Sequence, residues 1–96
     1  MPYLKEIREA STRIAPFIHN TPVLTNSSLN KLTDCELYFK CENFQRSGSF
    51  KIRGATNSVL QLSSQQLDRG IVTASSGNHG AALSMAASRM GVSPKV

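Results

Sequence analysis

The apolar residues at the start of the chain recur at helical spacing. Leu4, Ile7 and Ile14 fall near that spacing, and charged residues occupy the other faces. Proline lacks a backbone N–H and clashes with the preceding turn, so Pro16 should end or kink the helix close to Ala15. The pattern therefore predicts an amphipathic helix that stops at this point.

A short helix and a strand are expected next. Residues 27–32 can form a helix with Asn26 or Ser27 as its N-cap, and Asp34 should break it. Residues 36–42 alternate between apolar and polar side chains, which is typical of a half-buried strand.

The second half of the chain repeats the order of strand, loop and helix. Residues 50–62 carry an apolar stripe at helical spacing, with Ser49 as the expected N-cap. The β-branched run at 71–74 predicts a buried strand. An alanine-rich helix is expected at 81–90, with Gly91 as its stop. This order favours an α/β fold with parallel strands.

The predicted sheet is incomplete. A chain of 96 residues is enough for one small domain, so we expect no separate second domain within residues 1–96. A parallel sheet needs both faces covered, and two or three strands rarely suffice. Residues 91–96 end where a further strand is expected to begin, so we expect the chain to be a fragment of a larger domain.

The composition indicates a folded protein and argues against a nucleic-acid partner. Hydrophobic residues make up 40% of the chain, which excludes a disordered protein, and the formal net charge is +5. The basic residues are spread along the chain without a continuous run. Their densest group is Arg46, Lys51 and Arg53, and so compact a positive spot suits a small anion better than a polymer.

Nothing in the sequence predicts export, membrane insertion or a metal site. No stretch of about 18 apolar residues is present, and residues 1–6 lack the pattern of a secretory signal. Cys35 and Cys41 form neither a C-x-x-C pair nor part of a histidine cluster, so we expect no zinc site and no disulfide framework. We expect a cytoplasmic protein without a membrane partner.

Residues 47–54, Ser-Gly-Ser-Phe-Lys-Ile-Arg-Gly, place a lysine where a helix is expected to begin. The positive end of the helix dipole favours anions there, although surface lysines also occur at such positions. In the functional interpretation, Lys51 occupies this unfavourable position because its amine takes part in the chemistry. Positive potential and the neighbouring Arg53 favour the neutral amine, which is the form that makes a Schiff base with an aldehyde.

Residues 75–80, Ser-Ser-Gly-Asn-His-Gly, form a polar loop between the predicted strand and helix. Glycines let a ligand approach the backbone, and free N–H groups at a helix start attract an anion. Loops at the carboxyl ends of parallel strands are where open α/β sheets bind ligands. We favour a carboxylate or phosphate site over an ordinary polar turn, with His79 more typical of a structural donor than of a general base.

The two segments together resemble the pyridoxal-phosphate enzymes of fold type II, which are similar to the tryptophan synthase β subunit. Within them the resemblance is to the serine racemase and serine/threonine dehydratase (threonine ammonia-lyase) group. It runs through nearly the whole chain, including residues 21–24 and 39–42. It implies that residues 1–96 are the N-terminal fragment of a catalytic domain, an incomplete parallel sheet with flanking helices.

The resemblance also implies a role for individual residues. Lys51 matches the lysine that forms an aldimine with pyridoxal phosphate, Phe50 the residue beside the cofactor ring, and Asn78 the asparagine that binds the cofactor hydroxyl. Ser76 matches the serine that serves the opposite face of the substrate in racemases. The loop that surrounds the substrate carboxylate is matched by Ser75, Ser76, Asn78 and His79.

The activity implied is that of a lyase or isomerase acting on L-serine or L-threonine. Removal of the α-proton by Lys51 followed by loss of the β-hydroxyl gives dehydration, whereas reprotonation by Ser76 gives racemisation. A β-replacement enzyme of the cysteine synthase type is an alternative, against which Lys51-Ile52-Arg53 argues. A truncated, non-catalytic fragment is another, and we expect the 96-residue chain alone to be inactive.

Parts of the family's machinery have no match in the chain. The glycine-rich loop for the cofactor phosphate and the divalent-metal ligands lie downstream in this family. Ala81 stands where racemases that bind ATP usually carry glutamine. The resemblance nevertheless implies ATP and Mg²⁺ for the full-length protein, which we expect to be a homodimer, with candidate nucleotide-binding residues Asn26, Ser27, Ser28, Arg46 and Ser47.

Overall fold

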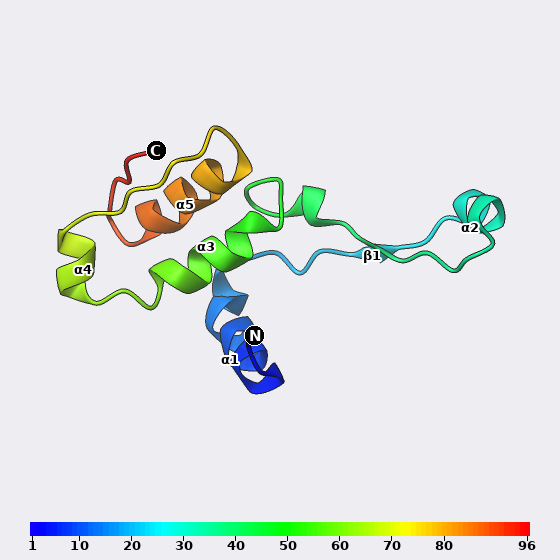
Figure 1. Cartoon of the computed structure of the whole chain (residues 1–96), viewed down its shortest axis with the longest axis horizontal. Coiled ribbons are helices and arrows are strands. Elements are labelled where there is room, and N and C mark those ends of the chain that lie inside the picture. The colour runs from blue at the N-terminus through cyan, green and yellow to red at the C-terminus, as the bar shows by residue number, and fades with distance from the viewer.

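Two helices, α3 (Lys51–Val59) and α5 (Asn78–Arg89), pack side by side and carry the core (Figure 1). The structure is a computed structural model that describes residues 1–96. The apolar stripe predicted on α3 is buried against α5, whose alanines allow the two backbones to approach closely. The buried cluster consists of Ile52, Ala55, Val59, Ala82, Leu83 and Ala86.

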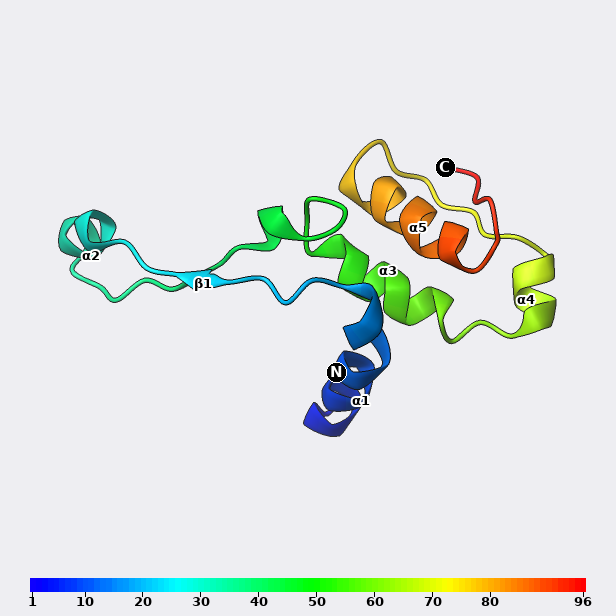
Figure 2. The ribbon, with the colours of Figure 1, turned by 180° about the vertical axis from the view of Figure 1, so that it is seen from behind.

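A two-stranded arm extends from this body (Figures 1 and 2). β1 (Val23–Leu24) pairs antiparallel with β2 (Phe39–Lys40), with Val23 opposite Lys40. Both strands are exposed, and β2 covers only two residues of the strand predicted at 36–42. The prediction of a half-buried strand was therefore wrong in both length and burial. β2 pairs with a single strand, β1, which has only two exposed residues, so nothing lengthens or covers β2.

The far end of the arm is a short helix, as the sequence predicts. α2 (Ser27–Thr33) is capped by the side chain of Asn26, which accepts a hydrogen bond from the N–H of Leu29 at 2.9 Å. Asp34 ends it with a left-handed φ of 52°. The predicted helix, its N-cap and its breaker are confirmed.

The first helix projects from the side of α3. α1 (Leu4–Ile14) continues into the 3-10 turn η1 (Ala15–Phe17), where Pro16 stands at the beginning of the new turn and ends the α-helix. Arg13 donates a hydrogen bond to the side chain of Asn57 on α3. Of the apolar residues on α1 only Ile14 is buried, so most of its apolar face is exposed.

The segment at 71–74 is not the buried strand that its β-branched residues predict. It makes a single parallel bridge, Val72 to Lys95, with hydrogen bonds of 2.9 Å on either side, and Val72 is 79% exposed. A parallel strand is buried only when other strands flank it and helices cover it. Here the one covering helix is α5, and the one neighbouring segment is the short stretch at Lys95. The predicted parallel arrangement is seen only at this bridge, where residues 71–74, α5 and Lys95 follow in the order of a βαβ unit. The strand predicted at 36–42 pairs antiparallel with β1 instead.

Several helix boundaries also differ from the predictions. α3 has Phe50 rather than Ser49 as its N-cap and ends at Val59, before Leu62. α5 begins at Asn78 instead of residue 81, so half of the polar loop belongs to its first turn. Gly91 ends it with φ of +72°, as expected. The remaining elements are single-turn connections, η2 (Glu42–Phe44) and α4 (Ser64–Asp68), and no helix is both long and apolar enough to cross a bilayer.

Candidate active site

Lys51 is the first residue of α3, and its amine is free. Its Nζ lies 5.1 Å from the centre of the Phe50 ring, within the range of a cation–π contact. The amine donates no hydrogen bond and joins no ion pair within the chain. Lys51 and Phe50 are both exposed. The lysine singled out by the sequence is therefore available to react.

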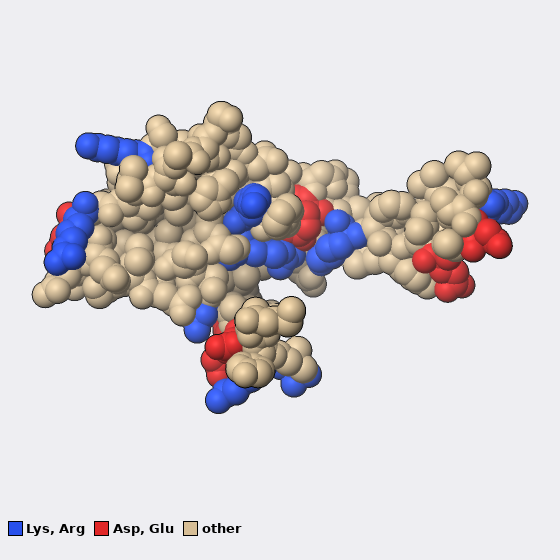
Figure 3. Space-filling view, viewed as in Figure 1, with Lys and Arg blue, Asp and Glu red and all other residues tan.

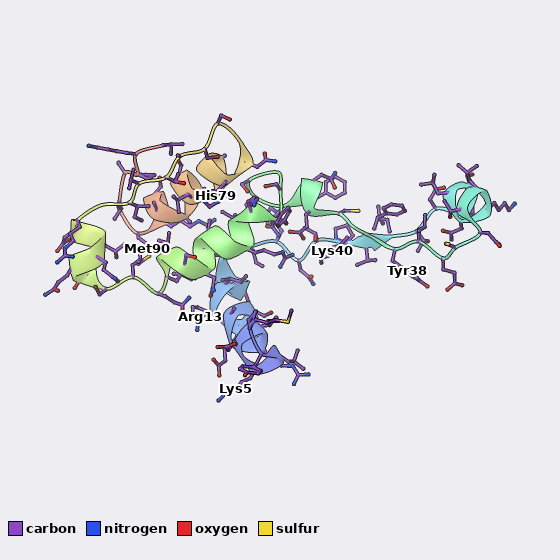
Figure 4. The ribbon with its side chains drawn as sticks, in the orientation of Figure 1. Lys5, Arg13, Tyr38, Lys40, His79 and Met90 are labelled. Carbon is purple, nitrogen blue, oxygen red and sulfur yellow. The ribbon has the colours of Figure 1, made fainter.

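A cavity of about 390 Å³ opens beside this amine, between α3 and the start of α5. His79, in the first turn of α5, lies on the side of that helix that faces α3 (Figure 4). The structure thus brings residues 50, 51 and 79 to one cavity from two segments of the sequence. Its lining consists of Phe50, Lys51, Arg53, Gly54, Ala55, Ser58 and His79.

The loop before α5 is organised around the hydroxyl of Ser75. This oxygen accepts hydrogen bonds from the N–H groups of Gly77 at 3.3 Å and Gly80 at 3.0 Å. The N–H groups of Asn78 and His79, at the start of the same helix, have no partner in the chain. Two donors are therefore left at the positive end of a helix of 12 residues, as an anion site requires.

The other predicted loop residues are not among those that line this cavity. Ser76 and Asn78 are exposed, and Ser75 is half-buried. Gly80 was not predicted as a functional residue, although it fixes the shape of the loop. A Cβ at this position would lie 2.7 Å from a Val96 methyl carbon and 3.2 Å from the Ser75 carbonyl oxygen. A side chain at position 80 would therefore require the Ser75 carbonyl to move by a few tenths of an ångström.

The candidate nucleotide-binding residues fall into two separate groups. Asn26, Ser27 and Ser28 form the start of α2 at the tip of the arm, whereas Arg46 and Ser47 lie in the turn before α3 (Figure 1). The arm accounts for much of the 54 Å length of the molecule. Within one chain the structure does not bring the two groups together.

An ion pair at the base of the arm was missed by the sequence analysis. Arg53 donates to both carboxylate oxygens of Glu42, at 2.8 and 2.7 Å, and the hydroxyl of Thr21 donates to the same carboxylate at 2.6 Å. The Arg53 guanidinium is the main cause that lowers the pKa of Glu42 to about 2. No local pattern links residues 42 and 53, because they lie in different elements, η2 and α3, and their side chains meet only in the folded chain.

This ion pair corrects the expected cluster of positive charge. The charge of Arg53 is compensated by Glu42, so it does not act on Lys51 as an isolated cation. The space-filling view shows acidic atoms among the basic ones where the arm joins the body (Figure 3). The compact cationic spot expected from residues 46, 51 and 53 is therefore a mixed surface.

Comparison with known proteins places the chain in a family of coenzyme-dependent enzymes. The family described as "Pyridoxal-phosphate dependent enzyme" matches residues 14–96. The chain is 60% identical to the serine racemase of Dictyostelium discoideum over 83 residues, which are 86% of this chain and 26% of that protein.

Two solved structures have the same backbone arrangement. The serine racemase of maize superposes with a TM-score of 0.90 at 48% identity over 95% of this chain and 29% of its own. A threonine deaminase from T.th. superposes with a TM-score of 0.86 at 40% identity, over 97% of this chain and 33% of its own. The arm, the projecting α1 and the packed helices are therefore the arrangement of fold type II enzymes. The chain spans between a quarter and a third of the length of these relatives.

Proposed function

The chain belongs to the family of pyridoxal-phosphate-dependent enzymes, and from this membership we propose that the protein carrying it is a serine/threonine dehydratase, a serine racemase, or both. The relatives named serine racemase or threonine deaminase are 40–60% identical to the chain, and the two solved structures among them share its fold. The observation that carries the proposal is the unpaired amine of Lys51 beside a cavity that α3 and α5 both line. The cysteine synthase alternative finds no support among these relatives.

The residues around Lys51 fit the aldehyde end of pyridoxal phosphate. An amine without hydrogen-bond or ionic partners can condense with an aldehyde, and Phe50 offers an aromatic face beside it. Asn78 would bind the ring hydroxyl of the coenzyme. When bound, the coenzyme withdraws electrons from the α-carbon of an amino acid and so weakens its C–H bond.

The chain's own residues would bind the substrate and move its protons. The free N–H groups of Asn78 and His79 would hold the substrate carboxylate, and Ser75 orders the loop that presents them. Lys51 Nζ would take the α-proton on one face. Ser76 Oγ would supply a proton on the other face, which inverts the configuration; without this step, loss of the β-hydroxyl leads to dehydration.

Covalent labelling tests the role of Lys51. We expect borohydride treatment of the protein with pyridoxal phosphate to attach the coenzyme to residue 51, as located by peptide mass spectrometry. Lys51→Ala should abolish the label together with serine turnover, whereas Lys31→Ala, on the exposed α2, should leave both unchanged. Labelling of a different lysine, or unchanged turnover in Lys51→Ala, would overturn the proposal.

For the assembled protein we further propose a cytoplasmic homodimer that acts on an amino acid and responds to ATP and Mg²⁺. Support comes from the resemblance of residues 26–28 and 46–47 to a nucleotide site. Because these groups lie apart in one chain, Asn26→Ala and Arg46→Ala separate their contributions. Each variant should reduce the activation of serine turnover by MgATP, and unchanged activation in both would contradict the nucleotide site.

A further inference from the structure

The first turn of α3, which carries Lys51, has little local stabilisation. Its N-cap, Phe50, makes no side-chain capping bond, and no acidic residue lies in the turn. The buried hydroxyl of Ser49 has no partner and does not cap the helix. A lysine at this end also opposes the helix dipole. The position of Lys51 must therefore be fixed by contacts from outside the helix.

Two tertiary contacts hold this turn. Ile52 is 2% exposed and anchors one side of it in the core. Arg53 is the only residue of the turn with a side-chain hydrogen bond, and it makes two, both to Glu42. Two parallel hydrogen bonds fix both the orientation of the Arg53 guanidinium and its distance from the Glu42 carboxylate. Arg53 also lines the cavity beside Lys51, so the pair acts at the wall of the candidate active site.

The carboxylate of Glu42 is itself held in place. The hydroxyl of Thr21 donates to it at 2.6 Å, and Thr21 is 5% exposed. Lys40 Nζ in turn donates to the Thr21 carbonyl oxygen at 2.7 Å. These contacts connect the base of the arm to the first turn of α3, and the Glu42 carboxylate compensates the positive charge of Arg53.

We propose that Glu42 is a positioning residue: through Arg53 it fixes the first turn of α3 and so aims the amine of Lys51 at the cavity. This inference rests on the proposed function. It assigns no chemical step to Glu42, whose carboxylate contacts Arg53 and Thr21 rather than the cavity. Removal of the carboxylate should therefore impair the reaction of Lys51 more than it impairs the fold.

The test compares Glu42→Gln with Arg13→Ala in the protein produced from its full reading frame. Arg13 also hydrogen-bonds to α3, through Asn57, but farther along the helix from Lys51, so its loss controls for weaker helix anchoring. The readouts are the rate of borohydride labelling at residue 51, the dissociation constant of pyridoxal phosphate, and kcat and KM for serine. The melting temperature reports how much each substitution destabilises the fold.

We expect Glu42→Gln to slow labelling and lower kcat by about tenfold with little change in KM, as loss of one charge-assisted bond implies. Arg13→Ala should change these values less than about twofold, and Glu42→Asp, which keeps the charge, should recover part of the loss. If Glu42→Gln does not fold, the double variant Glu42→Gln/Arg53→Gln, which leaves no unpaired charge, takes its place.

Equal effects of Glu42→Gln and Arg13→Ala at equal losses of melting temperature would overturn the inference, since a purely structural role predicts that result. So would labelling at the wild-type rate in Glu42→Gln. If the wild-type protein itself is not labelled at residue 51, the proposed function fails, and the inference fails with it. The wild-type control thus separates the two outcomes.

Discussion

Replacement of Gly80 by alanine tests whether the start of α5 depends on close packing of the loop. The new Cβ would lie 2.7 Å from a Val96 methyl carbon and 3.2 Å from the Ser75 carbonyl oxygen. The valine methyl can rotate away, but the carbonyl belongs to the backbone and must move by a few tenths of an ångström. That shift would displace the Ser75 hydroxyl, which accepts from the Gly80 N–H at 3.0 Å.

The magnitude follows from two opposing effects. Alanine is a better helix former than glycine by about 1 kcal/mol, while overpacking costs about 1–3 kcal/mol. Gly54, in the middle of α3, provides the matched control, because a Cβ there meets nothing within 4 Å. Helix propensity favours alanine at both sites, so the difference between the two variants isolates the steric cost. We expect Gly54→Ala to be the more stable by about 1–3 kcal/mol.

Urea unfolding followed by circular dichroism measures both free energies, with equal m-values as the condition for comparison. Gly80→Ala should in addition raise KM for serine, because Ser75 orders the N–H groups proposed to bind the substrate carboxylate. Equal stability of the two variants, with an unchanged KM, would refute the argument that the loop requires glycine at position 80.

Three further outcomes are expected. The Glu42–Arg53 pair should contribute about 1–2 kcal/mol to the free energy of unfolding, a value discounted for the partial exposure of Arg53. Because folding lowers the pKa of Glu42, this contribution is fully present above the unfolded pKa of 4.5 and is lost as pH falls towards 2. The unfolding free energies of the wild type and Glu42→Gln, measured across this pH range, should therefore converge at acid pH. Ser76→Ala should reduce racemisation more than dehydration in a chiral product assay, and equal losses would contradict a proton donor at residue 76. The purified 96-residue chain should bind pyridoxal phosphate more weakly than micromolar in an absorbance titration, and tighter binding that depends on Lys51 would contradict the expectation that the chain alone is inactive.

Local chemistry made much of the secondary structure predictable. Pro16 ends α1 because proline cannot continue a helix, and Asn26 caps α2 because its side chain can accept from a helix N–H. The stripe on α3 is buried as its spacing implies. The predictions failed where a segment depends on neighbours: residues 71–74 have strand composition, but without flanking strands they make one bridge.

The candidate site was predictable in part. The two motifs identified Lys51 and the loop at 75–80, and the structure brings Lys51 and His79 to one cavity. Ser49 was expected to cap α3, but the chain turns one residue later and leaves its hydroxyl buried without a partner. Gly80 is recognisable as a required glycine only when its distances to Ser75 and Val96 are known.

The sequence by itself determined the order of the helices and several of their caps and breakers, because these signals act within a few residues. Its short motifs also picked out the amine and the loop for which we propose the chemistry. Only the tertiary structure decided which side chains meet across the chain. The ion pair of Glu42 with Arg53 joins residues whose spacing predicts no contact, and the cavity forms between helices far apart in sequence. Such contacts arise when the elements pack together, so no local pattern records them.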